Sequence, residues 1–124
     1  MKIKFFVCET CGKVIAVLKD SGVPTICCGK PMKELIPGTT DASPEKHVPV
    51  YTVNGDTVNV CVGAAKHPMT PEHLIEWIAL HSSSGIDFRM LSAGQKPCAA
   101  FRLSEGETIE NVYAYCNIHG LWKA

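Results

Sequence analysis

The sequence predicts an all-β protein in which a small metal-stapled N-terminal domain is followed by a β-sandwich. Three observations predict this fold class. Four of the seven cysteines lie within the first 36 residues, a stretch of turn-forming residues follows, and several short β-rich runs then recur at regular spacing. A length of 124 residues, with 46% hydrophobic and 19% charged residues, is typical of one ordinary domain or of a small domain with an appendage.

The N-terminal unit, residues 1–36, is too short to fold by apolar burial alone. Chains below roughly 40 residues usually need disulfides, a metal ion or oligomerisation. Its cysteines supply the four sulfurs of one tetrahedral metal site: Cys8, Cys11, Cys27 and Cys28. Neighbouring side chains of an extended chain point to opposite faces, so the chain must bend sharply at Cys27-Cys28, which Gly29 permits. We therefore expect a distorted tetrahedral site. Sulfur ligands alone do not decide whether the metal is zinc or iron. A Cys27–Cys28 disulfide is the weaker alternative.

Residues 37–44 are predicted to form a linker, because they are rich in turn-forming residues and poor in apolar ones. The remaining residues, 45–124, are predicted to form the sandwich. Its first two strands are expected at residues 48–53 and 57–63, two valine-rich runs separated by Asn54-Gly55-Asp56. Asn-Gly between two β-rich runs is a strong signal for a hairpin.

Four further runs complete the expected sandwich: residues 74–81, 88–91, 99–103 and 109–115. The run at 74–81 also fits the period of a helix, since its apolar residues fall at both spacings. Its isoleucine and tryptophan content and its β-rich surroundings favour a strand. Short strands with turn residues between them are typical of a β-sandwich or barrel.

A second set of metal-ligand candidates is spread over residues 45–124. Its members lie in short segments that are flanked by proline or glycine: His47, His67, His73, Cys116 and His119. A cysteine and a histidine separated by two residues at the end of a strand can chelate one ion from one turn. Four nitrogens and one sulfur exceed the needs of tetrahedral zinc and suit a five-coordinate transition metal with an open sixth position. A thiolate ligand would push electron density toward a bound oxygen species.

Charged residues beside these ligands favour an anionic substrate. Lys46 directly precedes His47, on a predicted loop that also carries Glu45. A lysine over an open metal position would concentrate a small anion and orient a proton-donating water. The carboxylate of Glu45 is expected to occupy the open position once the metal is oxidised. Lys66 and Lys123 fit either a steering role or that of solvated surface lysines.

Composition argues against several other classes. Twelve basic and twelve acidic residues leave no overall charge that would favour nucleic acid or membrane binding. No stretch approaches the roughly 18 apolar residues of a membrane span, and the N-terminal apolar run is too short for a signal peptide, so we expect a cytoplasmic protein. An odd number of cysteines without a secretion signal argues against a disulfide framework.

Four residues outside the ligand sets have simpler interpretations. Cys61 lies in a valine-rich run and is interpreted as a small buried apolar residue, whereas Cys98 follows Lys-Pro and is expected to be more exposed. No pattern in the sequence supports a disulfide between them. Trp77 and Trp122 are expected in the core or at its rim, and Trp122 is close enough in sequence to the last two ligands to pack near the second site.

The two ligand sets together resemble desulfoferrodoxin, the two-iron class of superoxide reductase, over essentially the whole chain. The N-terminal cysteine pattern is similar to the desulforedoxin-type iron centre of that family. Three segments are similar to its catalytic segments: Glu45-Lys46-His47-Val48-Pro49, His67-Pro68-Met69 with His73, and Cys116-Asn117-Ile118-His119-Gly120. Cys61, Cys98 and His81 belong to neither motif.

The resemblance implies an immunoglobulin-like β-sandwich for residues 45–124, a homodimer, and iron at both sites, two ions per chain. It implies four histidines in a plane and an axial Cys116, with Glu45 as the sixth ligand of the oxidised resting state and Lys46 as the catalytic lysine. The implied reaction is the one-electron reduction of superoxide, with two protons, to hydrogen peroxide, with rubredoxin as the electron donor.

Three other functions stay open at this point. A pure electron carrier would use both metals and bind no substrate, so it would form no hydrogen peroxide from superoxide. A blue-copper protein also uses a Cys-x-x-His loop on a β-sandwich, but no methionine follows His119 and four histidines exceed the needs of that site. A zinc-ribbon binding module is disfavoured because residues 1–36 lack an arginine-rich stripe.

Overall fold

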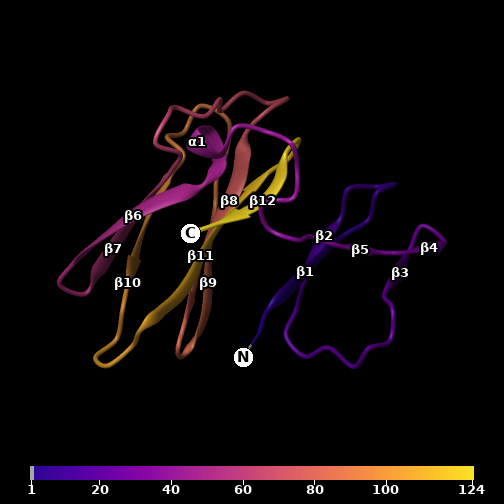
Figure 1. Cartoon of the computed structure of the whole chain (residues 1–124), viewed down its shortest axis with the longest axis horizontal. Coiled ribbons are helices and arrows are strands. Elements are labelled where there is room, and N and C mark those ends of the chain that lie inside the picture. The colour runs from indigo at the N-terminus through magenta and orange to yellow at the C-terminus, as the bar shows by residue number, and fades with distance from the viewer. Residues whose placement is uncertain (1) are drawn as a thin grey trace. The chain divides into compact units, whose positions relative to one another are not determined.

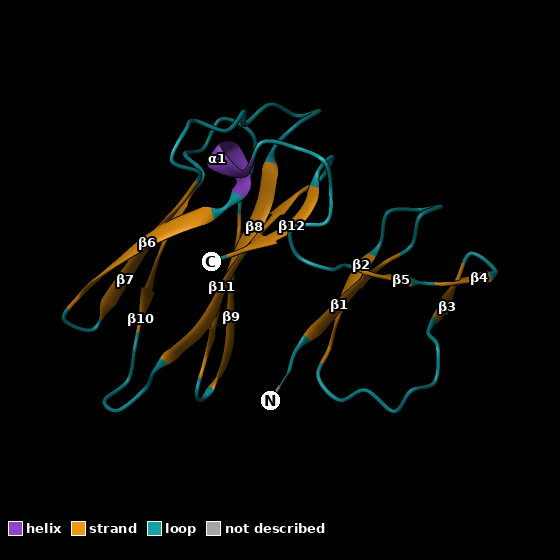
Figure 2. Ribbon diagram, in the orientation of Figure 1, coloured by secondary structure: helices purple, strands orange, loops and turns teal. Residues whose placement is uncertain are grey.

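The computed structural model describes residues 2–124, whose regular secondary structure is almost entirely strand, with loops and turns between the strands (Figures 1 and 2). Contacts divide the chain into two compact units, Met1–Ile36 and Pro37–Ala124. Within the described residues, one helical turn is present, α1 at Pro44–His47. The predicted all-β fold class is therefore confirmed. No helix of the described residues is long and apolar enough to cross a membrane.

The first unit is a three-stranded antiparallel sheet with a short hairpin. The sheet has the order β2-β1-β5, and the hairpin joins β3 to β4. The bounds are β1 Lys4–Val7, β2 Val14–Val17, β3 Ile26–Cys27, β4 Lys30–Pro31 and β5 Lys33–Glu34. Its buried apolar side chains are few: Ile3, Phe5, Cys8 and Met32. So small a core fits the expectation that this unit needs a metal to hold it together.

The second unit is a sandwich of two antiparallel sheets, with strand orders β10-β7-β6 and β12-β11-β8-β9 (Figure 1). The bounds are β6 Pro49–Asn54, β7 Thr57–Val62, β8 Ile75–Ser82, β9 Gly85–Met90, β10 Cys98–Arg102, β11 Ile109–Cys116 and β12 Gly120–Lys123. The predicted β-sandwich is confirmed.

The core of the sandwich follows from strand alternation. Val58, Val60 and Val62 of β7 are buried, and the residues between them face away from the core. They pack in one cluster with Phe101 of the neighbouring strand β10 and with side chains of the facing sheet, among them Ile78, Leu80 and Val112. This cluster keeps the loops at the strand ends in fixed positions.

Differences from the predicted elements have local causes. β8 is a strand, as favoured, and its burial along nearly the whole length explains the ambiguous pattern of its sequence. The β6–β7 hairpin is present, but Asn54 pairs with Thr57, so Gly55 and Asp56 form the two-residue turn. The helical turn α1 and the short strand β12 were not predicted, because four residues carry too little periodicity to be recognised.

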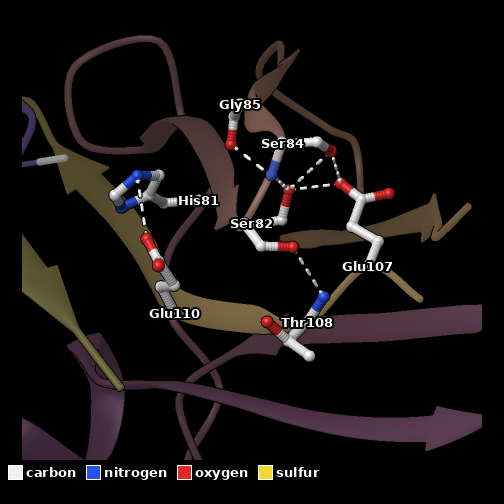
Figure 3. A network of polar contacts seen from close by, with 8 residues as sticks. His81, Ser82, Ser84, Gly85, Glu107, Thr108 and Glu110 are labelled. Carbon is white, nitrogen blue, oxygen red and sulfur yellow. Dashed lines mark hydrogen bonds and ion pairs between the residues drawn. The ribbon is translucent and has the colours of Figure 1, made fainter.

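A polar network ties together two connections of the sandwich (Figure 3). The carboxylate of Glu107 accepts hydrogen bonds from the hydroxyls of Ser82 and Ser84 and, at 2.8 Å, from the backbone N–H of Ser104. Nearby, the Nε2 atom of buried His81 lies 3.2 Å from a Glu110 carboxylate oxygen. The Glu107 contacts join the β8–β9 and β10–β11 connections, the His81–Glu110 pair joins β8 to β11, and none of these contacts involves a predicted metal ligand.

Cys61 and Cys98 form a disulfide between β7 and β10, where they lie directly opposite each other. Cys61 is exposed and Cys98 is partly buried, so the interpretation of Cys61 as a buried apolar residue is wrong, and so is the expectation that Cys98 is the more exposed of the two. Because Val60 and Val62 face the core, the residue between them must face outward. The expectation against disulfides also fails for this pair, since it depends on which strands become neighbours in the fold.

Candidate metal centres

The four N-terminal cysteines lie together, with all their sulfurs within 4.8 Å of one another. Cys8 and Cys11 come from a tight turn after β1, in which the Gly12 N–H donates to the Cys8 carbonyl at 2.8 Å. The Cys11 N–H also points at the Cys8 sulfur at 3.4 Å. A thiolate that accepts a backbone N–H in this way is typical of a metal-binding knuckle.

The adjacent pair reaches the same point because the chain reverses there. Cys27 ends β3 and pairs with Lys30, which leaves Cys28 and Gly29 as the two residues of the hairpin turn. Both have positive φ, 52° at Cys28 and 75° at Gly29. Positive φ at both positions is the requirement of a type I′ turn. The predicted sharp bend is present, and it involves Cys28 as well as Gly29.

The thiols of this cluster differ in acidity. Backbone N–H hydrogen bonding, first from Cys11, lowers the pKa of Cys8 to about 6. The pKa of Cys28 rises to about 12, first through the hydrogen bond with the side chain of Cys11, then through Cys8 and Cys27. Four sulfurs held this close cannot all ionise without a cation between them, so the cluster fits a bound metal ion.

The second set of predicted ligands meets at one end of the sandwich. His47 lies in α1 and is followed by β6, His67 and His73 lie in the β7–β8 connection, and Cys116 and His119 flank the β11–β12 turn. The antiparallel register brings these ends together, since Pro49 pairs with Val62 and Cys116 with Ile75. Their five donor atoms lie within 4.8 Å of one another.

The four imidazoles form a closed ring. Each ring contacts the next in the order His47, His67, His73, His119 and back to His47. Neighbouring centroids lie 4.7 to 5.1 Å apart, with interplanar angles of 74° to 86°. Such an arrangement directs one nitrogen of each ring toward a common centre.

The hydrogen bonds of these rings point to a cation at that centre. The Nδ1 atom of His47 lies 2.7 Å from the Ser43 carbonyl, and that of His67 lies 2.6 Å from the Pro68 carbonyl, so each Nδ1 carries the proton. The two Nε2 atoms, 3.1 Å apart, are then both acceptors and cannot hydrogen-bond to each other. The buried Nε2 of His73 has no hydrogen-bond partner among the described residues. A metal ion satisfies all three nitrogens.

Burial keeps these rings neutral, which is the state that binds metal. The pKa of His67 falls to about 4, first because the ring is buried and then because neighbouring histidines would repel its charge. Burial likewise lowers the pKa of His47 and of His73. At neutral pH these nitrogens therefore keep their lone pairs available.

Cys116 supplies the sulfur. Its side chain is fully buried, and its Sγ accepts the His119 N–H at 3.4 Å and lies 3.9 Å from the His119 Nδ1. Burial raises the pKa of the Cys116 thiol, so a cation is needed to hold the thiolate form. His119 thus faces the centre with Nδ1, whereas His47, His67 and His73 face it with Nε2.

Two residues outside the ligand sets position the ligands. The Asn117 side chain accepts the Leu74 N–H at 3.0 Å and donates to the Glu72 carbonyl at 2.9 Å, which clamps the chain on both sides of His73. Trp122 stacks on His47 at 5.0 Å and donates its indole N–H to the His119 carbonyl at 3.0 Å. The sequence placed Trp122 near this site; it indicated no role for Asn117, because no pattern links it to His73.

α1 is held against the β7–β8 connection by close backbone contact. The Ala65 N–H donates to the Glu45 carbonyl at 2.9 Å. Gly63 has φ +82°, and a Cβ there would lie 2.5 Å from the Ala65 oxygen and 2.7 Å from the Glu45 oxygen. Glycine is thus required at this point, and it allows α1 to carry His47 into the ring of imidazoles.

A basic cavity of about 510 Å³ lies beside the histidine centre. Three lysines line it together with His67: Lys46, Lys66 and Lys96. No acidic residue is among its described lining residues, so the cavity favours anions. Lys96 was not predicted, because its segment lies far from the ligands in the sequence. Lys123 is exposed on β12 and does not line the cavity.

The predicted acidic residue lies on α1, in a helical turn where the sequence suggested a loop. Glu45 is exposed, and its carboxylate accepts the Ser43 hydroxyl at 3.4 Å. Its oxygens are not among the donor atoms that cluster at the histidine centre.

Known protein families account for both units. A family model described as desulfoferrodoxin matches residues 39–124, and a second, described as the desulfoferrodoxin N-terminal domain, matches residues 2–35. The chain belongs to the desulfoferrodoxin family. A desulfoferrodoxin from Clostridium acetobutylicum is 43% identical to it over 122 residues, covering 98% of this chain and 95% of the relative. The predicted family is thereby confirmed.

Relatives named superoxide reductase are also similar to this member of the desulfoferrodoxin family. The crystal structure of the superoxide reductase from Treponema pallidum matches with a TM-score of 0.84 and 33% identity, covering 100% of this chain and 99% of that one. A superoxide reductase from Pyrococcus horikoshii is 41% identical over 97 residues, covering 64% of this chain and 84% of the relative. The four-cysteine cluster and the four-histidine, one-cysteine cluster fit the two iron sites of a desulfoferrodoxin.

Proposed function

We propose that this protein is a superoxide reductase, which reduces superoxide by one electron, with two protons, to hydrogen peroxide. One observation carries the proposal: a closed ring of four imidazoles and a buried thiol lies beside a cavity lined by lysines. The names of the relatives support it. A ferrous ion held by His47, His67, His73, Cys116 and His119 would supply the electron.

The residues of the chain then have distinct roles. Lys46 and Lys66 attract the superoxide anion into the cavity, and the ammonium group of Lys46 orients a water that donates a proton. The Cys116 thiolate makes the centre electron-rich. Glu45, which shares α1 with Lys46 and His47, would supply a carboxylate ligand to the oxidised iron. This last role requires the Glu45 carboxylate to leave the Ser43 hydroxyl.

We assign the parts of the chain accordingly. Residues 1–36 form a desulforedoxin-like iron domain, 37–44 a linker, and 45–124 the superoxide reductase domain, an assignment that the two matched family models support. A rubredoxin-type protein supplies electrons, and the protein works in the cytoplasm. Both of these statements rest on the resemblance to the family.

A homodimer is part of the proposal. β6 is an edge strand of its sheet, and its side chains Val50, Tyr51 and Val53 are exposed. Exposed apolar residues on an unpaired edge strand are suited to pairing with another chain. Light scattering on the protein as it elutes from a size-exclusion column is expected to give the mass of two chains. A mass of one chain would contradict the dimer.

Mixing the reduced protein with pulses of superoxide tests the activity. We expect one hydrogen peroxide for each superoxide consumed, without release of oxygen. Half that yield together with oxygen would indicate a dismutase. No peroxide would indicate a pure electron carrier, and either result would overturn the proposal. Metal analysis of the same sample, with iron expected at both sites, tests the cofactor against zinc and copper.

A further inference from the structure

The Cys61–Cys98 disulfide lies at the edge of the basic cavity. Cys98 is the first residue of β10, and the two residues before it, Lys96 and Pro97, line the cavity with His67. The Pro97 carbonyl accepts the N–H of Val62 at 2.8 Å, next to Cys61 on β7. The disulfide therefore anchors the chain directly after the wall of the cavity that carries Lys96.

The pair is accessible to small reagents. Cys61 is exposed and Cys98 is only partly buried, and neither is a ligand of the two metal clusters. In an antiparallel pair the two residues face each other at short distance, here 4.0 Å between Cα atoms, so the thiols need little movement to join. In reducing compartments such disulfides are usually transient and redox-active rather than structural.

We propose that Cys61 and Cys98 form a second redox site, a dithiol that hydrogen peroxide oxidises reversibly to the disulfide, and that this bond holds Lys96 at the cavity. The proposal rests on the proposed function for its oxidant, because superoxide reduction releases peroxide in that cavity. The exposed Cys61 thiolate attacks one peroxide oxygen, which gives a sulfenic acid and, after protonation, water. The Cys98 thiol then attacks the sulfenic sulfur, the disulfide forms, and a second water leaves.

The electrons and atoms balance. Two thiols lose two electrons and two protons in total, and one peroxide takes them up and becomes two waters. A dithiol reductant reverses the step by thiol–disulfide exchange. The site thus consumes one molecule of hydrogen peroxide for each disulfide formed. The disulfide therefore forms when peroxide accumulates.

Cysteine mapping of the iron-loaded full chain tests the chemistry. The protein is reduced with dithiothreitol without oxygen, freed of reductant and treated with one equivalent of hydrogen peroxide. Cysteines are then alkylated in denaturant and identified by mass spectrometry. We expect the loss of two alkylatable thiols per chain, at Cys61 and Cys98, and their return after renewed dithiothreitol. If both stay alkylatable after several equivalents of peroxide, the redox site is refuted.

The Cys61→Ser variant, and superoxide in place of added peroxide, distinguish a failure of this redox site from a failure of the proposed function. Cys61→Ser is expected to leave Cys98 unable to form the intramolecular bond while both metal clusters stay loaded. Superoxide pulses should oxidise the pair in the unmodified protein, and catalase should suppress that oxidation. If added peroxide forms the bond and superoxide pulses form no more of it than their spontaneous dismutation to peroxide and oxygen allows, the redox site stands and the proposed function fails.

Hydrogen exchange tests the link to the cavity. The Val62 and Cys98 amides donate to the Pro97 and Lys96 carbonyls, both at 2.8 Å. We expect these two amides to exchange roughly tenfold faster in the dithiol form, while the Asn54–Thr57 turn at the other end of β7 is unchanged. Equal exchange in both forms would show that the bond does not hold the segment carrying Lys96.

Discussion

Two imidazoles at the histidine centre, those of His47 and His67, present Nε2 because their Nδ1 atoms are already engaged. The Ser43 and Pro68 carbonyls take the Nδ1 protons of His47 and His67, which leaves Nε2 for a metal. His119 faces the centre with Nδ1, which lies 3.9 Å from the Cys116 sulfur. Single hydrogen bonds thus decide which nitrogen His47 and His67 present, and single substitutions at this centre should change its chemistry.

Cys116→Ser should abolish superoxide reduction, because a hydroxyl cannot supply the electron-rich thiolate. The sulfur is fully buried, so no neighbouring group can replace it. The four-cysteine site lies in the other unit and should keep its metal and its absorption bands. Stopped-flow kinetics and metal analysis measure both effects. Full activity in this variant would refute the assignment of Cys116 as a ligand of the catalytic iron.

Lys46→Ala should slow the reaction with superoxide by about tenfold and weaken its dependence on ionic strength, because one of the three cavity lysines is lost. Lys123→Ala is the matched control, since Lys123 is exposed and does not line the cavity. Rate constants at several salt concentrations measure the effect. A salt dependence equal to that of the unmodified protein would remove Lys46 from the steering role.

The metal-free protein should lose stability in acid because of His67. Its folded-state pKa of about 4 lies below the ordinary 6.5, so between these values the unfolded chain binds the extra proton. The free energy of unfolding should therefore fall by about 3 kcal/mol as the pH drops from about 6.5 to about 4. Urea unfolding followed by tryptophan fluorescence reports this, since Trp77 and Trp122 both lie in the second unit.

The His67→Gln variant is the control for this pH effect. Glutamine does not titrate, so the variant should show a smaller loss of stability between the same pH values. An identical pH dependence in the two proteins would mean that other groups, such as His47 and His73, carry it; their pKa values are lowered by burial as well.

At the scale of elements, the site depends on how α1 meets the end of β7. The helical turn has Pro44 at its start, and two backbone hydrogen bonds close it, from the Lys46 N–H to the Ser43 carbonyl and from the Val48 N–H to the Pro44 carbonyl. So short a helix is not stable by itself. Its position comes from the β7–β8 connection, which it contacts at Gly63 and Ala65.

Gly63→Ala should therefore displace α1 and lower both stability and iron content. The new Cβ would meet backbone oxygens of Ala65 and Glu45 below 3.0 Å, in addition to the strain of positive φ. We expect the free energy of unfolding, measured with urea, to fall by about 3 kcal/mol. Metal analysis should show a lower iron content. The control is Gly106→Ala, with φ +79° and nothing within 4 Å, which should cost about 1 kcal/mol. Equal losses would show that the close approach at Gly63 is unimportant.

At the scale of the whole molecule, the two units depend on metal to different degrees. The first unit buries few apolar side chains, whereas the sandwich has a continuous core that spans both of its sheets. A unit with so little apolar burial gains most of its folding free energy from the metal.

Cys11→Ser should therefore unfold the first unit and leave the second one folded. We expect fast hydrogen exchange over residues 2–36 and unchanged protection in β7, β8 and β11. Cys116→Ser is the reciprocal control, with protection of residues 2–36 retained. Continued protection of residues 2–36 in Cys11→Ser would show that the apolar side chains alone suffice to fold this unit.

The sequence by itself determined the fold class, both ligand sets and the family. Ligand spacings such as Cys8-x-x-Cys11 and Cys116-x-x-His119 are local features of the sequence. The alternation of Val58, Val60 and Val62 indicates a strand, whichever strand becomes its neighbour. These features depend on residues that are close in the chain, so they can be recognised without knowing which strands become neighbours.

Only the tertiary structure decided what depends on strand pairing. The Cys61–Cys98 disulfide exists because β7 lies beside β10, and Lys96 reaches the cavity for the same reason. The clamp of Asn117 around His73 likewise joins two connections that are far apart in the sequence. The physical reason is that such contacts follow from the packing of the core, which is a property of the folded chain as a whole.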